Sequence, residues 1–346
     1  TVPQLAQQLK SEGVGRTCVI TDEPQKYRDA GAMPGDVEVR HRADLIALEK
    51  ELRELRGVTA IIYDQACAAE KRRRRKRGTY PDPLKRYFIN SAVCEGCGDC
   101  GRVSNCVSLL PHQTALGVKR RIDQGSCNKD YSCADGFCPS FVTVVGGRLR
   151  RGVEREDGGR CETLAAALPK PASPLVERPY NILVAGIGGT GVVTVGALLG
   201  MAAHLEGKAC TVLDPTGLSQ KNGAVFSHVR LAPDQGDLTT ARIGIGGTDT
   251  LIGCDLVVAG SADAAGICDA ARTKGVVNTH LVPLARLQQD AQWELPAESY
   301  LEVLRTSTAI GADDRFDATE LADKLFGNAL LANIILLGAA HQKGLI

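Results

Sequence analysis

The sequence has few aromatic residues, no long apolar run and no excess of charge of one sign. Aromatic residues make up only 4% of the chain, which argues against a stacking platform for single-stranded nucleic acid. Lysine and arginine number 41 against 40 aspartates and glutamates, so the net charge of +1 gives no chain-wide attraction to nucleic acid or membrane. The longest apolar run, Ala329 to Ala340, is interrupted by Asn333 and Gly338 and is far shorter than the ~20 residues that span a bilayer.

A secretory signal is also missing at the start of the sequence. The first residues, TVPQLAQQLK, have no basic start followed by an apolar stretch, so we expect a cytoplasmic protein. In such a protein 13 cysteines indicate metal or redox chemistry rather than disulfides. The length of 346 residues and the hydrophobic fraction of 44% predict two or three domains with real cores.

Hydrophobic patterns predict an α/β chain in two parts, separated by a cysteine-rich segment without regular periodicity. In the first part we expect helices at 3–12 and 43–55 and strands at 16–21, 36–40 and 58–63. In the second part we expect helices at 190–204, 318–326 and 330–343, and strands at 181–186, 209–214, 225–231, 242–245, 256–260 and 276–280. No internal repeat is visible.

The cysteine-rich segment has the spacing of an iron–sulfur protein. Its two runs are Cys94-x2-Cys97-x2-Cys100-x5-Cys106 and Cys127-x5-Cys133-x4-Cys138-Pro139. Three cysteines in one short loop can bind three corners of a [4Fe–4S] cube, and in bacterial ferredoxins the fourth ligand is a Cys-Pro cysteine of the partner half. The predicted ligands are therefore Cys94, Cys97, Cys100 and Cys138, with Cys106 as the alternative fourth ligand.

Two other arrangements of these cysteines stay open. A second cluster would use Cys106, Cys127 and Cys133 plus one more group, because seven cysteines cannot fill eight thiolate positions. A zinc ribbon is the other alternative, although three cysteines at consecutive x2 spacing fit zinc less well.

A glycine loop opens the second part of the chain. Residues 181–191, NILVAGIGGTG, place a Gly186-x-Gly188-x-x-Gly191 fingerprint between a strand and a helix, where free amides and the helix dipole favour a phosphate. The fingerprint does not choose among a dinucleotide, coenzyme A and a nucleotide, and Asp214 ends the next strand where a ribose-binding acid would lie. A turn needed only for packing is the alternative. The candidate binding residues are Gly186, Gly188, Gly189, Thr190 and Gly191, together with the polar segment Ser219, Gln220, Lys221 and Asn222.

A basic run, Lys71–Arg77, precedes the cysteines. It is typical of a nucleic-acid patch or of a solvated helix face. A third interpretation is that its charge guides an acidic electron carrier toward the cluster.

Three stretches together resemble one family. They are IIYDQACAAEKRRRRKRG, CEGCGDCGRVSNC…SCNKDYSCADGFCPSFVTV and NILVAGIGGTGVVTVGALLG…DPTGLSQKNGAVFSHVR. The chain resembles the fused indolepyruvate ferredoxin oxidoreductases, of the thiamine-diphosphate-dependent 2-oxoacid:ferredoxin oxidoreductase family. The resemblance covers nearly the whole chain, and its cysteine and SQKNG segments are specific.

The resemblance implies a domain plan. Residues 1–66 would be the C-terminal part of a parallel α/β thiamine-diphosphate-binding domain, followed by a basic linker at 67–87. Residues 88–148 would be a ferredoxin-like segment, and a second linker at 149–178 would lead to a Rossmann-like gamma domain at 179–346. We expect the chain to be a portion of a longer polypeptide, with its end truncated as well as its start.

The resemblance also implies an activity. The family decarboxylates an aryl 2-oxoacid oxidatively to an acyl-coenzyme A and passes the electrons through [4Fe–4S] to ferredoxin. Expected partners are ferredoxin, the remaining domains of the enzyme, the 2-oxoacid and further copies in a homo-oligomer, with neither nucleic acid nor membrane. Coenzyme A is the expected co-substrate, with a role for the gamma domain in that step.

Two departures from the family pattern limit these expectations. The sequence has no Gly-Asp-Gly element followed by Asn, so thiamine diphosphate and Mg²⁺ would be bound by parts of the enzyme outside this chain. We therefore expect this portion alone to be inactive. The x5 spacing between Cys100 and Cys106 is also longer than the x3 of simple ferredoxins.

Two functions of other classes compete with this one. The first is a nicotinamide- or flavin-dependent iron–sulfur oxidoreductase that uses the glycine loop and Asp214 for its dinucleotide. The second is a non-catalytic, zinc-stabilised interaction module that carries the basic run.

Overall fold

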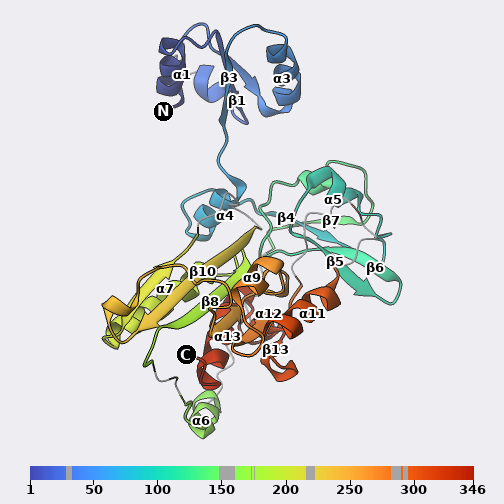
Figure 1. Ribbon diagram of the computed structural model, residues 1–346. Coiled ribbons are helices and arrows are strands. Elements are labelled where there is room, and N and C mark those ends of the chain that lie inside the picture. Colours follow the sequence, from blue (N-terminus) through green and yellow to red (C-terminus); the bar gives the residue numbers. More distant parts are fainter. Residues whose placement is uncertain are drawn as a thin grey trace. The chain divides into compact units, whose positions relative to one another are not determined.

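The described residues form an α/β architecture with four β-sheets (Figure 1). The structure is a computed structural model that describes residues 1–28, 33–147, 160–172, 174, 176–215, 223–281, 290 and 295–346. They divide into two compact units, 1–83 with 128–130 and 84–127 with 131–346. The predicted α/β class is confirmed.

A three-stranded parallel sheet in the order β2-β1-β3 forms the first unit. Its elements are α1 (Val2–Ser11), β1 (Arg16–Thr21), α2 (Gln25–Arg28), β2 (Glu38–His41), η1 (Arg42–Asp44), α3 (Leu45–Arg53), β3 (Thr59–Asp64) and α4 (Ala68–Lys76). Leu48 and Leu52 of α3 pack on one face of β1, and Ala6 of α1 packs on the other. The elements predicted for this part of the chain are confirmed, with small shifts at their ends.

The cysteine-rich segment is built on two short antiparallel ladders. Its elements are β4 (Lys85–Ile89), α5 (Asp99–Ser104), β5 (Leu109–Thr114), β6 (Gly117–Ile122), η2 (Ser132–Ala134) and β7 (Phe141–Val145). Strand β4 pairs with β7, β5 pairs with β6, and α5 packs against η2. The order strand, cysteine run, helix, strand thus occurs twice, so the expectation of no internal repeat was wrong.

The carboxy-terminal part is a six-stranded sheet in the order β13-β12-β11-β8-β10-β9. Its strands are β8 (Tyr180–Ile187), β9 (Ala209–Leu213), β10 (Ala224–Ala232), β11 (Thr250–Gly253), β12 (Lys274–Asn278) and β13 (Arg315–Phe316). Strands β8, β11, β12 and β13 are parallel, and β10 runs antiparallel to both of its neighbours. An antiparallel strand therefore separates β8 from β9.

Helices cover both faces of this sheet. They are α7 (Val192–Leu205), η3 (Gln235–Asp237), α8 (Leu256–Ala259), α9 (Ala262–Ile267), α11 (Ala297–Ser307), η4 (Ala312–Asp314), α12 (Ala318–Phe326), η5 (Ala329–Leu331) and α13 (Ala332–Gln342), preceded by α6 (Arg160–Ala167) in the predicted linker. Helices α7, α12 and α13 bury their apolar side chains in one core, and α8 and α11 bury theirs in the other.

Two predicted strands of this part were wrong. Residues 256–259 form α8 instead, because the buried Asp255 caps this helix by accepting the Val258 N–H at 2.9 Å. A short apolar run does not distinguish a buried strand from a buried helix. Residues 242–245 are outside any strand, yet Ile243 is buried against the sheet.

We expect truncation of Leu336 to destabilise the carboxy-terminal part. Its side chain is fully buried in the core beneath α13, so Leu336→Ala should lower the free energy of unfolding by about 2–5 kcal/mol. Ile334 lies on the same helix with 44% of its surface exposed, and Ile334→Ala should cost only about 0.5 kcal/mol. Urea denaturation of both variants measures the difference, and equal losses would show that α13 does not pack as described.

Candidate metal centre and glycine loop

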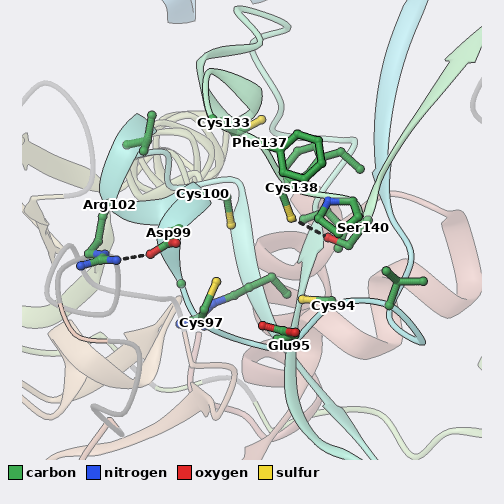
Figure 2. Close-up of a pocket in the computed structure, with 18 residues that line it drawn as sticks. Cys94, Glu95, Cys97, Asp99, Cys100, Arg102, Cys133, Phe137, Cys138 and Ser140 are labelled. Atoms are coloured by element: carbon green, nitrogen blue, oxygen red, sulfur yellow. Dashed lines mark hydrogen bonds and ion pairs between the residues drawn. The ribbon is translucent and has the colours of Figure 1, made fainter.

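A cavity of about 610 Å³ in the cysteine-rich segment is lined by five cysteines. They are Cys94, Cys97, Cys100, Cys133 and Cys138. In Figure 2 the sulfurs of four of them point toward a common space, and the sulfur of Cys133 lies apart from the others. The four are the predicted first-choice ligands, and their role as ligands stays a prediction.

The first cysteine run turns tightly because two of its glycines adopt a left-handed backbone. Gly96 has φ +77° and Gly98 has φ +81°, and Gly98 is the N-cap of α5. A Cβ atom at Gly96 would lie 2.3 Å from the carbonyl oxygen of Val118, so this position also requires glycine for space. The loop thereby places Cys94, Cys97 and Cys100 on the wall of one cavity.

Cys138 reaches the same cavity through the pairing of β4 with β7. Ile89 stands opposite Phe141 in that ladder, and the Asn90 N–H donates to the Ser140 carbonyl oxygen at 2.8 Å. The Asn90 carbonyl in turn accepts the N–H of Cys94 at 2.9 Å. These backbone bonds hold the start of one cysteine run beside the end of the other.

The cavity also contains a buried positive charge. Arg120, on β6, is only 4% exposed and forms no ion pair with a carboxylate in the described part of the chain. Burial raises the pKa of the Cys100 thiol to about 11, and the charge of Arg120 opposes this rise. Because buried charges are normally compensated, an arginine that faces thiols fits an anionic group in this cavity.

The cysteines around the cavity fit an iron–sulfur cluster better than a single metal ion. Among the described residues no three His, Cys, Asp or Glu side chains converge closely enough to hold a single metal ion. A [4Fe–4S] cluster holds its thiolates at separate corners of a cube, so it needs no convergence on a single point. Four cysteine sulfurs around a cavity, beside a buried cation, match that requirement.

The remaining cysteines of the segment lie elsewhere. Cys106 and Cys127 are half-buried and are not among the residues that line the cavity, although Cys106 packs against the buried group that includes Cys94. The role of Cys106 as the alternative fourth ligand stays a prediction. Sequence reasoning did not anticipate Cys133 or Arg120 on the cavity wall. The sequence of β6 gave no indication that the side chain of Arg120 points into the cavity.

The glycine loop has the predicted strand–turn–helix form. Strand β8 ends at Ile187, Gly189 and Gly191 have φ +106° and +87°, and Gly191 is the N-cap of α7. A Cβ atom at Gly186 would lie within 3 Å of three side chains, so this position has room only for glycine. The turn brings Gly186, Gly188, Gly189, Thr190 and Gly191 together.

Several polar groups of this loop already form hydrogen bonds within the protein. The Gly188 N–H donates to the Gly223 carbonyl at 2.9 Å, and the Thr190 N–H and hydroxyl both donate to the Ile187 carbonyl. The amide of Ile187 donates to Asp255, whose pKa is raised by burial and drawn down by the N–H groups that it accepts. Sequence patterns did not identify Asp255, which fixes the base of the loop.

The structure says little about the arrangement of the other candidate residues. Ser219, Gln220, Lys221 and Asn222 lie outside the described residues. The basic run forms the end of α4, where Glu70 pairs with Arg73 and Arg74. Arg75 donates to the carbonyls of Pro81 and Asn128, so part of the run is structural.

Among the described residues, the helices are all too short or too polar to cross a membrane.

Residues 181–346 match the family described as Pyruvate ferredoxin/flavodoxin oxidoreductase. The Indolepyruvate oxidoreductase subunit IorB of Pyrococcus horikoshii is 28% identical over 166 residues, which cover 48% of this chain and 78% of that protein. The IorB subunit of Thermococcus kodakarensis matches with the same identity and the same coverage. The pyruvate oxidoreductase subunit PORC of Thermotoga maritima, a solved structure, is 16% identical over 49% of this chain and 79% of that chain, with a TM-score of 0.34.

Substitution of Gly96 tests the tight turn of the first cysteine run. Gly96→Ala should lose more stability than Gly117→Ala, because both glycines are left-handed but nothing lies within 4 Å of a Cβ at Gly117. The left-handed backbone alone should cost about 1–2 kcal/mol, and the overlap with Val118 adds to this only at Gly96. Denaturant unfolding of the two variants measures the difference. Equal losses would contradict the close approach between the loop and β6.

Proposed function

We propose that this chain is the electron-transfer and gamma portion of an indolepyruvate-type (aryl 2-oxoacid):ferredoxin oxidoreductase, because residues 181–346 match the pyruvate ferredoxin/flavodoxin oxidoreductase family. The names of the IorB relatives support the indolepyruvate type. In this reaction a 2-oxoacid and coenzyme A give carbon dioxide and an acyl-coenzyme A. The two electrons that are released leave singly, one to each of two ferredoxins.

The observation that carries the proposal is the thiol-lined cavity with its buried arginine. Cys94, Cys97, Cys100 and Cys138 would hold a [4Fe–4S] cluster, which supplies one-electron transfer when bound. Arg120 would offset the negative charge of the thiolates and the cluster, since its guanidinium is almost fully removed from water. The buried Ile89 and Leu109 form the apolar floor of the segment and exclude water from that side.

The residues of this chain account for only part of the reaction. In our proposal thiamine diphosphate and Mg²⁺ are bound by other parts of the enzyme, so decarboxylation needs those parts. Residues 1–66 would belong to the thiamine-binding domain, 88–148 would be the electron-transfer segment and 179–346 the gamma domain, joined by linkers at 67–87 and 149–178. On this assignment the isolated chain carries electrons but does not decarboxylate.

We assign coenzyme A to the glycine loop of the gamma domain. Gly189 lies over open space at the start of α7, so a phosphate could approach the backbone there without displacing a side chain. The order of the strands in the sheet fits a dinucleotide less well than it fits coenzyme A. Strand β10 lies between β8 and β9, so Asp214 stands two strand spacings, roughly 10 Å, from the strand that carries the loop.

Iron and sulfide analysis tests the proposed cluster. The chain, purified without oxygen, should be brown, and Cys97→Ala and Cys138→Ala should each hold less iron than the unchanged chain, by between about one atom and all four atoms of the cluster. Both side chains are exposed, so the folded core should survive their truncation. Cys210→Ala, outside the cysteine-rich segment, should keep the full content. Zinc in place of iron would overturn the proposal and favour an interaction module.

Titration calorimetry with coenzyme A tests the glycine loop. Gly189→Asp places a carboxylate in open space beside the loop, so it should weaken coenzyme A binding at least tenfold by repulsion of the phosphates. Gly207→Asp adds the same charge at another open position with a left-handed backbone, at the far end of α7, and should leave binding unchanged. Equal affinities of both variants and the unchanged chain would remove coenzyme A from this loop. Binding of NADH with bleaching of a bound flavin would favour the dinucleotide alternative.

A further inference from the structure

The second cysteine run has the spacing of the first, with one residue type changed. The first run is Cys94-x2-Cys97-x2-Cys100. The second contains Cys127, then Asp130 and then Cys133, again with two residues in each interval. Asp130 therefore occupies the position that corresponds to Cys97.

The backbone repeats as well as the spacing. In the first run the residues on either side of Cys97 are left-handed, and both are glycines. In the second run the residues on either side of Asp130, Lys129 and Tyr131, are also left-handed, with φ +53° and +66°. A side chain makes this conformation costly, yet the loop adopts it at both sites that flank Asp130, where glycine would have been easier.

The helices that follow the two runs begin in the same way. Gly98 is the left-handed N-cap of α5, and Tyr131 is the left-handed N-cap of η2. In each case the third ligand position, Cys100 or Cys133, is the second residue of the helix. The whole unit is thus duplicated, β4 to β5 and then β6 to β7, with α5 packed against η2.

The duplication also assigns the fourth cysteines. In two-cluster ferredoxins the last cysteine of each run binds the cluster of the other run. Cys138 follows this rule, since it lines the cavity of the first run. By the same exchange Cys106 belongs with the second run, and Cys100, Cys106 and Cys133 all pack against the one buried group of Ile89, Cys94 and Leu109 that lies between the two runs.

We propose that Asp130 replaces a cysteine as the fourth ligand of a second [4Fe–4S] cluster, together with Cys106, Cys127 and Cys133. This provides the eighth ligand that seven cysteines lack, and it explains the fifth thiol on the first cavity as a ligand of the neighbouring cluster. The three ligands of the second run lie in one continuous loop of seven residues, so chain connectivity alone keeps them near each other. The inference rests on the proposed function only in that both assign iron–sulfur chemistry to this segment.

A carboxylate ligand gives the second cluster a distinct chemistry. Oxygen is a harder ligand than sulfur and suits an iron–sulfide core less well, so the iron held by Asp130 is the one most easily lost. Mild oxidation by ferricyanide should remove it. A [4Fe–4S]²⁺ cluster then releases Fe²⁺ and gives one electron to ferricyanide, which leaves [3Fe–4S]⁺.

The test combines iron analysis with electron paramagnetic resonance of the anaerobically purified chain. The unchanged chain should hold about eight irons, and ferricyanide should convert one cluster to the paramagnetic [3Fe–4S]⁺ form with loss of about one iron. Asp130→Cys should keep about eight irons and suppress that conversion at least severalfold. Asp130→Ala should hold about seven irons before any oxidant is added, and ferricyanide should then oxidise its [3Fe–4S]⁰ cluster to the [3Fe–4S]⁺ signal without further loss of iron.

Asp135→Ala is the matched control. It removes an exposed carboxylate two residues beyond Cys133, outside the repeated spacing, and should behave like the unchanged chain. About four irons in the unchanged chain, unaffected at position 130, would overturn the second cluster and leave the proposed function intact. About eight irons with no effect of either Asp130 substitution would overturn the role of Asp130 alone. A chain without iron would instead remove the proposed function.

Discussion

The ladder between β4 and β7 is the constraint on which the candidate metal centre depends. The first cysteine run follows β4 and the Cys-Pro cysteine precedes β7, so these strands close the chain into one loop. The bonds from Asn90 to Ser140 and from Cys94 to Asn90 extend that closure into the cavity. Strand pairing therefore offsets the entropic cost of closing this loop. Iron would then bind to thiols that the fold has already brought together.

Much of the fold and part of the candidate site could be predicted from the sequence. Spacing predicted Cys94, Cys97 and Cys100, because it reflects the reach of a single loop, and the Cys-Pro pair predicted Cys138; the sulfurs of these four surround a common space. Asp255 and Arg120 were not found, since their importance depends on burial by residues distant in the sequence. The helix at α8 was missed because a capping carboxylate, rather than periodicity, determines where it starts.

The duplication in the cysteine-rich segment shows a further limit of sequence patterns. Residue identity hides the repeat, because Lys129 and Tyr131 stand where the first run has glycines and Asp130 stands where it has a cysteine. Backbone dihedral angles and strand pairing reveal it, since both runs keep one geometry with different side chains. In the carboxy-terminal sheet the reverse holds. The familiar glycine fingerprint is present, but an antiparallel β10 changes which elements lie beside it.

The exposed edge of the cavity has a consequence for the environment in which the protein works. Cys97 and Cys138 are exposed, and the neighbouring Phe137 is 99% exposed. The rate of electron tunnelling falls exponentially with distance, so a cluster at this edge would exchange electrons quickly with a protein docked against it. The same short path would admit dioxygen and peroxide, which destroy exposed cubanes. Fast electron exchange and resistance to oxidants would therefore be opposed in this geometry, so a cluster here would need surroundings with little dioxygen or peroxide.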